Sequence, residues 1–191
     1  MFVTSNALIF WKNFIYLHSI TEKLKGDIVP LFIKYSLVLN KILENLITDY
    51  FEKNPSFFLV GSNMNSSNKI SIIIDGDQGV KISDCVSLGK YLRNNLVEEL
   101  YDFSFEVSSA GLTSPLIYPR QFIKNLNRKL NIQSINGEEF TGNLSEVNND
   151  NVKIEWFSRE PKPLGKGKIS VLNNKSLLFN EIKEAKLIVE F

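Results

Sequence analysis

The sequence has 191 residues, of which 43% are hydrophobic and 23% charged, a balance typical of a globular protein and not of a disordered tail. A single cysteine, Cys85, excludes an internal disulfide framework and suits a reducing compartment, and a single histidine, His18, argues against a zinc site. The net charge of +1 is divided unevenly, because residues 37–108 carry 6 Lys/Arg and 10 Asp/Glu whereas residues 109–191 carry 12 and 9. We therefore expect the acidic half to suit a basic protein and the basic half to suit phosphate or an acidic surface.

The first 36 residues form the least regular part of the chain. Lys12 and the charged stretch 22–27 interrupt the apolar runs, so neither a membrane span nor a secretory signal is expected. One interpretation is an amphipathic helix at a membrane interface. We favour the other, an extension of doubtful order over residues 1–36 or translated sequence upstream of the true start.

A regular pattern begins at Ser36. Apolar residues from Leu39 to Tyr50 recur at i, i+3, i+4, i+7, i+8 and i+11, which predicts a helix that ends at Asn54-Pro55. The apolar runs 57–64 and 69–75 are separated by a polar turn and predict a hairpin of two strands.

A second helix is predicted with Ser83 as its N-cap. Its core face is formed by Cys85, Leu88, Leu92 and Leu96. Cys85 is interpreted as a core residue and not a nucleophile, because no base accompanies it. With a third strand over 101–107, the order α-β-β-α-β predicts an α/β domain at 37–108, with helices on one face of a small sheet.

The segment EVSSAGLTSPL, residues 106–116, resembles a catalytic turn at first sight because it is rich in hydroxyl groups. A hydrolase elbow requires glycine two positions before the serine, whereas Val107 occupies that place before Ser109. We interpret residues 109–119 as a linker, in which glycine allows a turn and proline stiffens the exit. The predicted linker motif consists of Ser108, Ser109, Gly111, Leu112 and Pro115.

The remainder, residues 120–191, is predicted to form a small SH3-like or Sm-like β-barrel. A short helix or turn over 119–129 precedes strands at 129–135, 139–147, 151–157 and 186–191. Turn signals separate the first three strands as in a β-meander. A polar loop with the sequence PKPLGKGK and one helical turn at FNEIKEA come before the last strand.

Two basic sets are candidates for binding rRNA or a protein. Arg120, Lys124 and Arg128 would share one face of a helix, and Lys162, Lys166 and Lys168 lie in the polar loop. An ordinary solvated surface explains either set as well. Trp156 and Phe157 point to opposite faces of their strand, so at least one of them is a candidate surface anchor.

No catalytic, metal or cofactor site is predicted. Asp75 and Asp77 begin a segment with the spacing of a calcium loop, but Val80 and Val86 replace the glycine and glutamate that such a loop requires. The enzyme alternative, a metal-dependent RNA hydrolase that uses these two carboxylates, is ranked below binding functions.

The chain resembles the ribosome maturation factor RimP family over residues 37–191, about four-fifths of its length. The resemblance is carried by DGDQGVKISDCVSLGKYL, RQFIKNLNRKL, FNEIKEAKLIVEF and the family core V-S-S-[PA]-G-L-x-x-P-L, which Val107 to Leu116 match at every fixed place. Many relatives have Asp-Arg where this chain has Thr113-Ser114, and a glycine where it has Asn127, which tolerates left-handed backbone angles.

The resemblance implies a KH-like domain followed by an SH3-like barrel and a cytoplasmic, non-enzymatic assembly factor. Such factors bind the free small (30S) ribosomal subunit, near a ribosomal protein of the decoding side and the adjacent rRNA. A monomer without cofactors is expected, with no membrane partner. The alternative that remains is a general Sm-like RNA-binding regulator.

Overall fold

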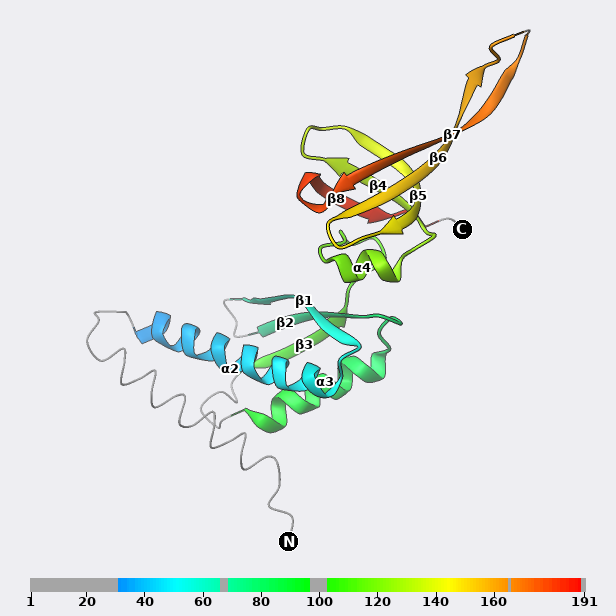
Figure 1. Cartoon of the computed structure of the whole chain (residues 1–191). Helices are drawn as coiled ribbons and strands as arrows, with labels where there is room; N and C mark the ends of the chain where they lie inside the picture. Colours follow the sequence, from blue (N-terminus) through cyan, green and yellow to red (C-terminus); the bar gives the residue numbers. More distant parts are fainter. Residues whose placement is uncertain (1–30, 66–68, 97–102, 165, 190–191) are drawn as a thin grey trace. The chain divides into compact units, whose positions relative to one another are not determined.

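The computed structural model describes residues 31–65, 69–96, 103–164 and 166–189. These residues form a mixed α+β protein with two sheets and three α-helices, labelled as in Figure 1. The chain divides into two compact units, the first ending at Ser109 and the second beginning at Ala110. Each unit is described by itself.

The first helix of the described residues, α2 (Leu31–Lys53), begins five residues before the predicted start at Ser36. The reason lies in the sequence, because Leu31 and Tyr35 continue the four-residue spacing that leads to Leu39. The predicted extension therefore overlaps this helix from residue 31 onward. Its other residues, 1–30, lie outside the described residues.

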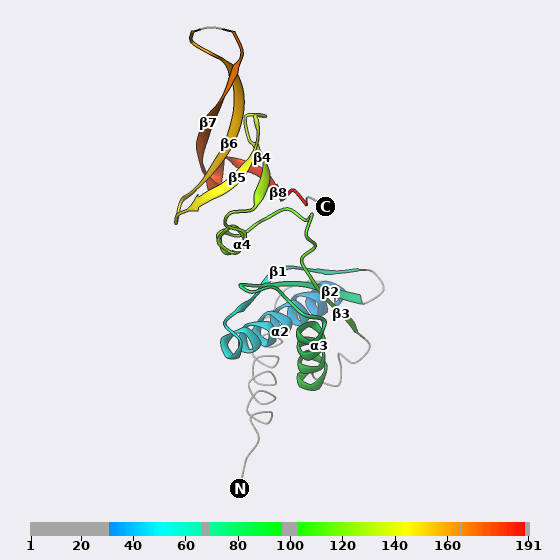
Figure 2. The ribbon, with the colours of Figure 1, turned by 90° about the vertical axis from the view of Figure 1, so that its right-hand side faces the viewer.

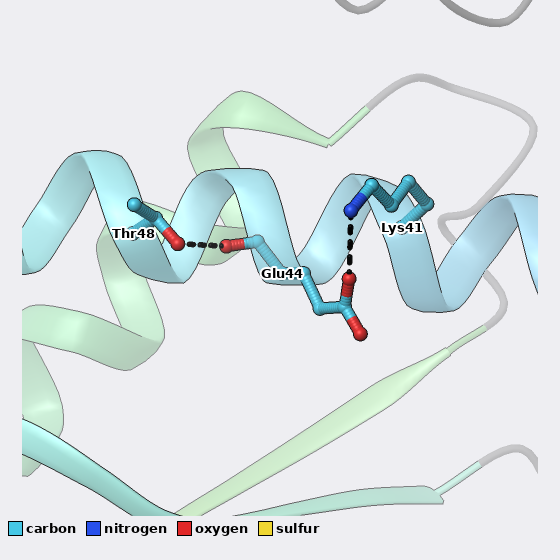
Figure 3. A network of polar contacts seen from close by, with 3 residues as sticks. All are labelled: Lys41, Glu44 and Thr48. Carbon is cyan, nitrogen blue, oxygen red and sulfur yellow. Dashed lines mark hydrogen bonds and ion pairs between the residues drawn. The ribbon is translucent and has the colours of Figure 1, made fainter.

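Polar contacts occupy the solvent side of α2 (Figure 3). Lys41 Nζ lies 3.2 Å from Glu44 Oε2, and the Thr48 hydroxyl donates a hydrogen bond of 2.7 Å to the Glu44 carbonyl oxygen. Exposed pairs of this kind contribute about 0–1 kcal/mol each. The stability of α2 must therefore come from its apolar stripe, which packs on the sheet.

The sheet of the first unit has the order β1-β2-β3. Strands β1 (Phe57–Met64) and β2 (Lys69–Gly76) pair antiparallel, which confirms the predicted hairpin, and β3 (Ser104–Ser109) pairs parallel to β2. Helix α2 and the next helix, α3 (Ile82–Asn95), lie on one face of this sheet (Figure 2), as the order α-β-β-α-β predicts. The core between them contains Leu39, Ile42, Leu46, Ile70, Ile72, Ile74, Leu88 and Leu92.

Helix α3 (Ile82–Asn95) confirms the predicted core face but not the predicted cap. The N-cap is Lys81, because the Asp84 carboxylate accepts a hydrogen bond of 2.8 Å from the Lys81 backbone N–H, and Ser83 is already helical. Cys85 is half-buried against the core. Burial and the nearby Asp84 charge raise the pKa of the Cys85 thiol, which favours its protonated, less nucleophilic form at neutral pH.

The third strand extends further than predicted. Ser108 and Ser109, predicted as linker residues, belong to β3 and pair in parallel with Ile73 and Ile74 of β2. Backbone pairing with β2 therefore extends the strand into the segment that was predicted as linker. The predicted beginning of this strand, at residues 101 and 102, lies outside the described residues.

The second unit is an antiparallel sheet of five strands in the order β7-β6-β5-β4-β8. The strands are β4 (Lys129–Ser134), β5 (Glu139–Val147), β6 (Asn151–Pro161), β7 (Lys168–Leu178) and β8 (Ile182–Leu187). Helix α4 (Pro119–Lys124) precedes them, and a 3-10 turn, η2 (Phe179–Glu181), links the last two. The core is formed by Phe122, Leu130, Ile132, Leu144, Val152, Ile154, Leu177, Ala185 and Leu187.

The meander β4-β5-β6 confirms the prediction, whereas the region after it differs. Strand β6 continues to Pro161, and β7, for which no strand was predicted, pairs with it from Asn151–Leu178 to Pro161–Lys168. The last strand covers 182–187 and not 186–191, whose last two residues lie outside the described residues. The predicted helical turn is present as η2.

Candidate functional site

The family-like segment after β3 folds into a turn that leads into the second unit. The Ser114 backbone N–H donates to the Gly111 carbonyl oxygen at 3.0 Å, which closes the turn that Gly111 was predicted to allow. Leu112 is exposed beside it. After Pro115, the Leu116 N–H donates to the Ala185 carbonyl of β8 at 2.8 Å, so this end of the segment is fixed to the sheet.

Helix α4 is positioned by two buried polar side chains, Gln121 and Asn125. Gln121 Oε1 accepts hydrogen bonds from the backbone N–H groups of Ile117 and Tyr118, at 2.8 and 3.1 Å. Asn125 Nδ2 donates to the Gln121 carbonyl oxygen at 2.8 Å and ends the helix. These contacts satisfy backbone groups that a short helix leaves unpaired at its ends.

We expect Gln121→Ala to lower the free energy of unfolding by about 1–3 kcal/mol, because two backbone donors lose their acceptor. Thermal or urea unfolding of the full chain measures the loss. Gln133→Ala is the matched control, because Gln133 is only half-buried in β4. Equal stability of both variants would mean that Gln121 does not hold the start of α4.

The first basic set does not form the predicted helical face. Arg120 and Lys124 lie on α4 one turn apart, but the helix ends at Lys124, and Arg128 lies beyond it. The turn is made by Asn127, whose φ of 64° confirms that it takes a left-handed conformation. Arg128 is exposed, and its Nη1 donates to Asn125 Oδ1 at 3.0 Å. The prediction that Arg120, Lys124 and Arg128 share one face of a helix is therefore wrong.

The second basic set lies at the outer end of a two-stranded ribbon formed by β6 and β7, which extends past the other strands of its unit (Figure 2). Lys162 and Lys166 are in the connection and Lys168 is the first residue of β7, and all three are exposed. The Lys162 N–H donates to the Gly167 carbonyl oxygen at 3.1 Å, and Gly167 has a positive φ of 116°. The segment predicted as a solvated loop thus lies at the end of a two-stranded ribbon.

The ribbon also exposes residues that the sequence did not single out. Leu172 is 51% exposed and lies opposite Phe157, which is 73% exposed, and Arg159 is exposed two residues further along β6. Of the two residues predicted to point to opposite faces, Phe157 is the exposed one, whereas Trp156 packs toward the core near Phe140. Leu172 could not be identified without β7, because its place depends on the cross-strand register.

Features of an enzyme or a metal site are not evident in the parts of the chain that the structure describes. Among these residues there is no group of three His, Cys, Asp or Glu side chains that could hold a metal ion. Asp75 is buried, with Oδ1 accepting from the Gly76 N–H at 2.8 Å, as in a polar turn after a strand. Within the described residues, no helix is long and apolar enough to cross a membrane.

Two pockets are evident among the described residues. One of about 370 Å³ lies between α2 and the edge strand β1 and is lined partly by Asn40, Glu44 and Asn63. The other, of about 260 Å³, lies beside α4 and is lined mainly by Pro115, Leu116, Phe122 and Phe179. The basic ribbon gathers exposed cations beside an exposed aromatic ring, and it is therefore the more informative candidate site.

Comparison with known proteins identifies several similar chains, although no protein-family model matches. Ribosome maturation factor RimP of Christiangramia forsetii is 40% identical over 154 residues, which cover 81% of this chain and 100% of the relative. The protein of the same name from Flavobacterium psychrophilum is 40% identical over 153 residues, or 80% of this chain and 96% of the relative. That of Porphyromonas gingivalis is 32% identical over 145 residues, or 75% and 94%.

Proposed function

Because the chain belongs to the ribosome maturation factor RimP family, we propose that it assists maturation of the small (30S) ribosomal subunit by binding and not by catalysis. The observation that carries the proposal is similarity over four-fifths of the chain to proteins named for ribosome maturation. The role is that of an assembly factor in the cytoplasm, which binds free subunits as a monomer and then leaves.

We assign the two units to the domain types that the family resemblance implies. Residues 37–108 form the KH-like domain, 109–119 the linker and 120–191 the SH3-like barrel. Helices on one face of a three-stranded sheet support the first assignment, and an all-antiparallel sheet of five strands supports the second. The extended strand β3 and the early start of α2 shift these borders by a few residues.

The proposed partners follow from the uneven charge of the chain. The acidic residues of the first unit suit a basic ribosomal protein near the decoding side, whereas the basic ribbon suits rRNA phosphate. The residues proposed to contact rRNA are Lys162, Lys166 and Lys168, together with Arg120, Lys124 and Arg128 as separate contacts. Arg120 and Lys124 are half-buried, so the three exposed ribbon lysines are the stronger candidates.

Co-sedimentation of the purified full chain with ribosomal particles tests the proposal. We expect the chain to accompany free small subunits and to be depleted from mature ribosomes, because an assembly factor must leave when its site matures. Equal binding to both particles, or binding to neither, contradicts the proposal. A general Sm-like RNA regulator would instead bind unrelated RNAs with comparable affinity and a steep dependence on salt.

A second experiment measures the role in the cell. Expression of the chain in a bacterial strain that lacks its own maturation factor is expected to reduce the amount of precursor small-subunit rRNA. The Asp75→Asn, Asp77→Asn double variant serves as the control for the enzyme alternative. Activity close to that of the original chain is expected, because Asp75 is buried and the other acidic residues of the first unit remain.

A further inference from the structure

Phe157 and Leu172 form an exposed apolar pair on the ribbon. They are cross-strand partners, so their side chains lie on one face, and they are 73% and 51% exposed. The neighbouring Trp156 points to the opposite face and packs near Phe140, with ring centroids 6.1 Å apart. The strand register therefore holds the Phe157 ring in solvent, where it contributes nothing to the core.

Basic residues continue along the same face toward the tip. Arg159 follows Phe157 by two residues, about 7 Å along the strand. Lys168 lies opposite Pro161, one step further on this face. Glu160 points to the other face, where it accepts a hydrogen bond of 3.0 Å from the Ser158 hydroxyl. The exposed ring therefore has cations on its outer side.

The charge of the outer ribbon favours an anionic partner. Residues 157–172 contain four basic residues and one acidic residue, a net charge of +3. The acidic residue nearest to Phe157 on its own face, Glu155, is half-buried and paired with Lys153 at 3.0 Å. This leaves the positive charges at the tip without a compensating acidic residue on that face.

We propose that this ribbon face, which consists of Phe157, Leu172, Arg159 and Lys168, binds single-stranded RNA by stacking an unpaired base on the Phe157 ring. Proteins that bind single strands combine cations that follow the backbone with aromatic rings on which bases stack. A duplex offers the same phosphates, but its bases are already stacked and paired. The inference deepens the proposed function, on which it rests, because it assigns the ribbon to an unpaired stretch of immature rRNA.

The test measures binding of the full chain to a ten-nucleotide RNA that carries 2-aminopurine, whose fluorescence falls on stacking, and to a duplex of the same sequence. All affinities are measured at one salt concentration. We expect Phe157→Ala to weaken binding of the single strand by about 5- to 150-fold, the range for loss of one base–aromatic stack, and to abolish the quenching. Phe157→Tyr keeps a ring and is expected to bind like the original chain.

Ile135→Ala is the matched control, because Ile135 is 61% exposed in the same unit but lies outside the ribbon. It should bind RNA like the original chain. Unchanged affinity and quenching in Phe157→Ala would overturn the proposal, as would binding of the duplex as tightly as the single strand. Since Phe157 is 73% exposed and does not belong to the core cluster of its unit, the variant should remain folded, and circular dichroism checks this.

Co-sedimentation with small subunits separates this proposal from the broader function. If Phe157→Ala loses subunit binding but keeps RNA binding, the face contacts a ribosomal protein, which overturns base stacking and leaves the assembly role intact. If RNA binding depends on Phe157 while the original chain does not bind subunits, base stacking is supported and the proposed assembly role fails.

Discussion

Replacing Phe122 by alanine is expected to lower the free energy of unfolding of the second unit by about 3–5 kcal/mol, the range for truncating a buried aromatic side chain. Phe122 is only 2% exposed and is the one hydrophobic side chain of α4 in the core of that unit. Its ring meets Phe179 edge to face, with centroids 5.3 Å apart. The substitution removes this contact and leaves a cavity between α4 and the sheet.

Tryptophan fluorescence measures this loss selectively. Trp156 is half-buried in the second unit, and the only other tryptophan, Trp11, is replaced by phenylalanine in every variant. Denaturant unfolding followed at Trp156 then gives the free energy of the second unit. Ile123→Ala is the matched control, because Ile123 is adjacent in α4 but 60% exposed, and its change should stay within about 0.5 kcal/mol.

A small change for Phe122→Ala, no greater than that of the control, would mean that α4 is not anchored through this ring. The expected loss of free energy of unfolding is a large part of the stability of a small unit, so a milder substitution is needed in case Phe122→Ala does not fold. If Phe122→Ala does not fold, Phe122→Leu retains part of the apolar volume, and a loss of roughly 1–2 kcal/mol is expected for it. The loss of stability should then be smallest for Ile123→Ala, larger for Phe122→Leu and largest for Phe122→Ala, and this order tests whether the Phe122 ring anchors α4.

The parts of the fold that were predicted correctly depend on local patterns. The helical stripe that includes Leu39 and Leu46 identified the buried face of α2, and the turn signal at Asn136-Gly137 separated β4 from β5. Asn127 was recognised as able to adopt left-handed angles, and its φ is 64°. In each case the residue's own neighbours in sequence decide its structure.

The errors arise where pairing with a distant strand decides the conformation. Asn173 and Asn174 have low strand propensity, and no strand was predicted over β7. In the fold, Asn173 Nδ2 donates to the Ser158 hydroxyl of β6 at 2.8 Å, a contact across the ribbon that replaces apolar packing. Ser108 in β3 is likewise held by its pairing with Ile73 of β2.

The candidate site shows the same division. Its positive charge was evident from the sequence, because Lys162, Lys166 and Lys168 are close together along the chain. The position of Leu172 beside Phe157 was not, since it requires the register of β7 against β6. The positive charge of this segment was therefore predictable from the sequence, whereas the surface that combines the Phe157 ring with cations became evident only from the fold.

Removing the three ribbon lysines is expected to give the largest effect on binding. If Lys162, Lys166 and Lys168 each contact one phosphate, replacing all three by glutamine should weaken binding to free small subunits by about 100- to 500-fold at 0.1 M salt. Each phosphate contact contributes about 0.7–0.9 to the slope of log affinity against log salt, so three contacts contribute about 2–3. Over the tenfold range of salt between 0.1 and 1 M, this slope corresponds to the stated loss of affinity. Exposed lysines at a ribbon tip support no core, so stability should be unchanged.

The dependence on salt distinguishes contact with phosphate from a general effect of charge. In the triple variant, the slope should fall by about 2–3. A matched variant with Lys81, Lys90 and Arg93 replaced by glutamine loses the same formal charge from exposed positions on and beside α3 in the first unit. The slope of this variant should keep the original value. The slope measures the counterions that are released where cations contact phosphates, whereas a loss of charge elsewhere weakens only the long-range attraction. If both variants lose the same affinity and slope, the ribbon makes no special contact, and its lysines act only through the net charge of the chain.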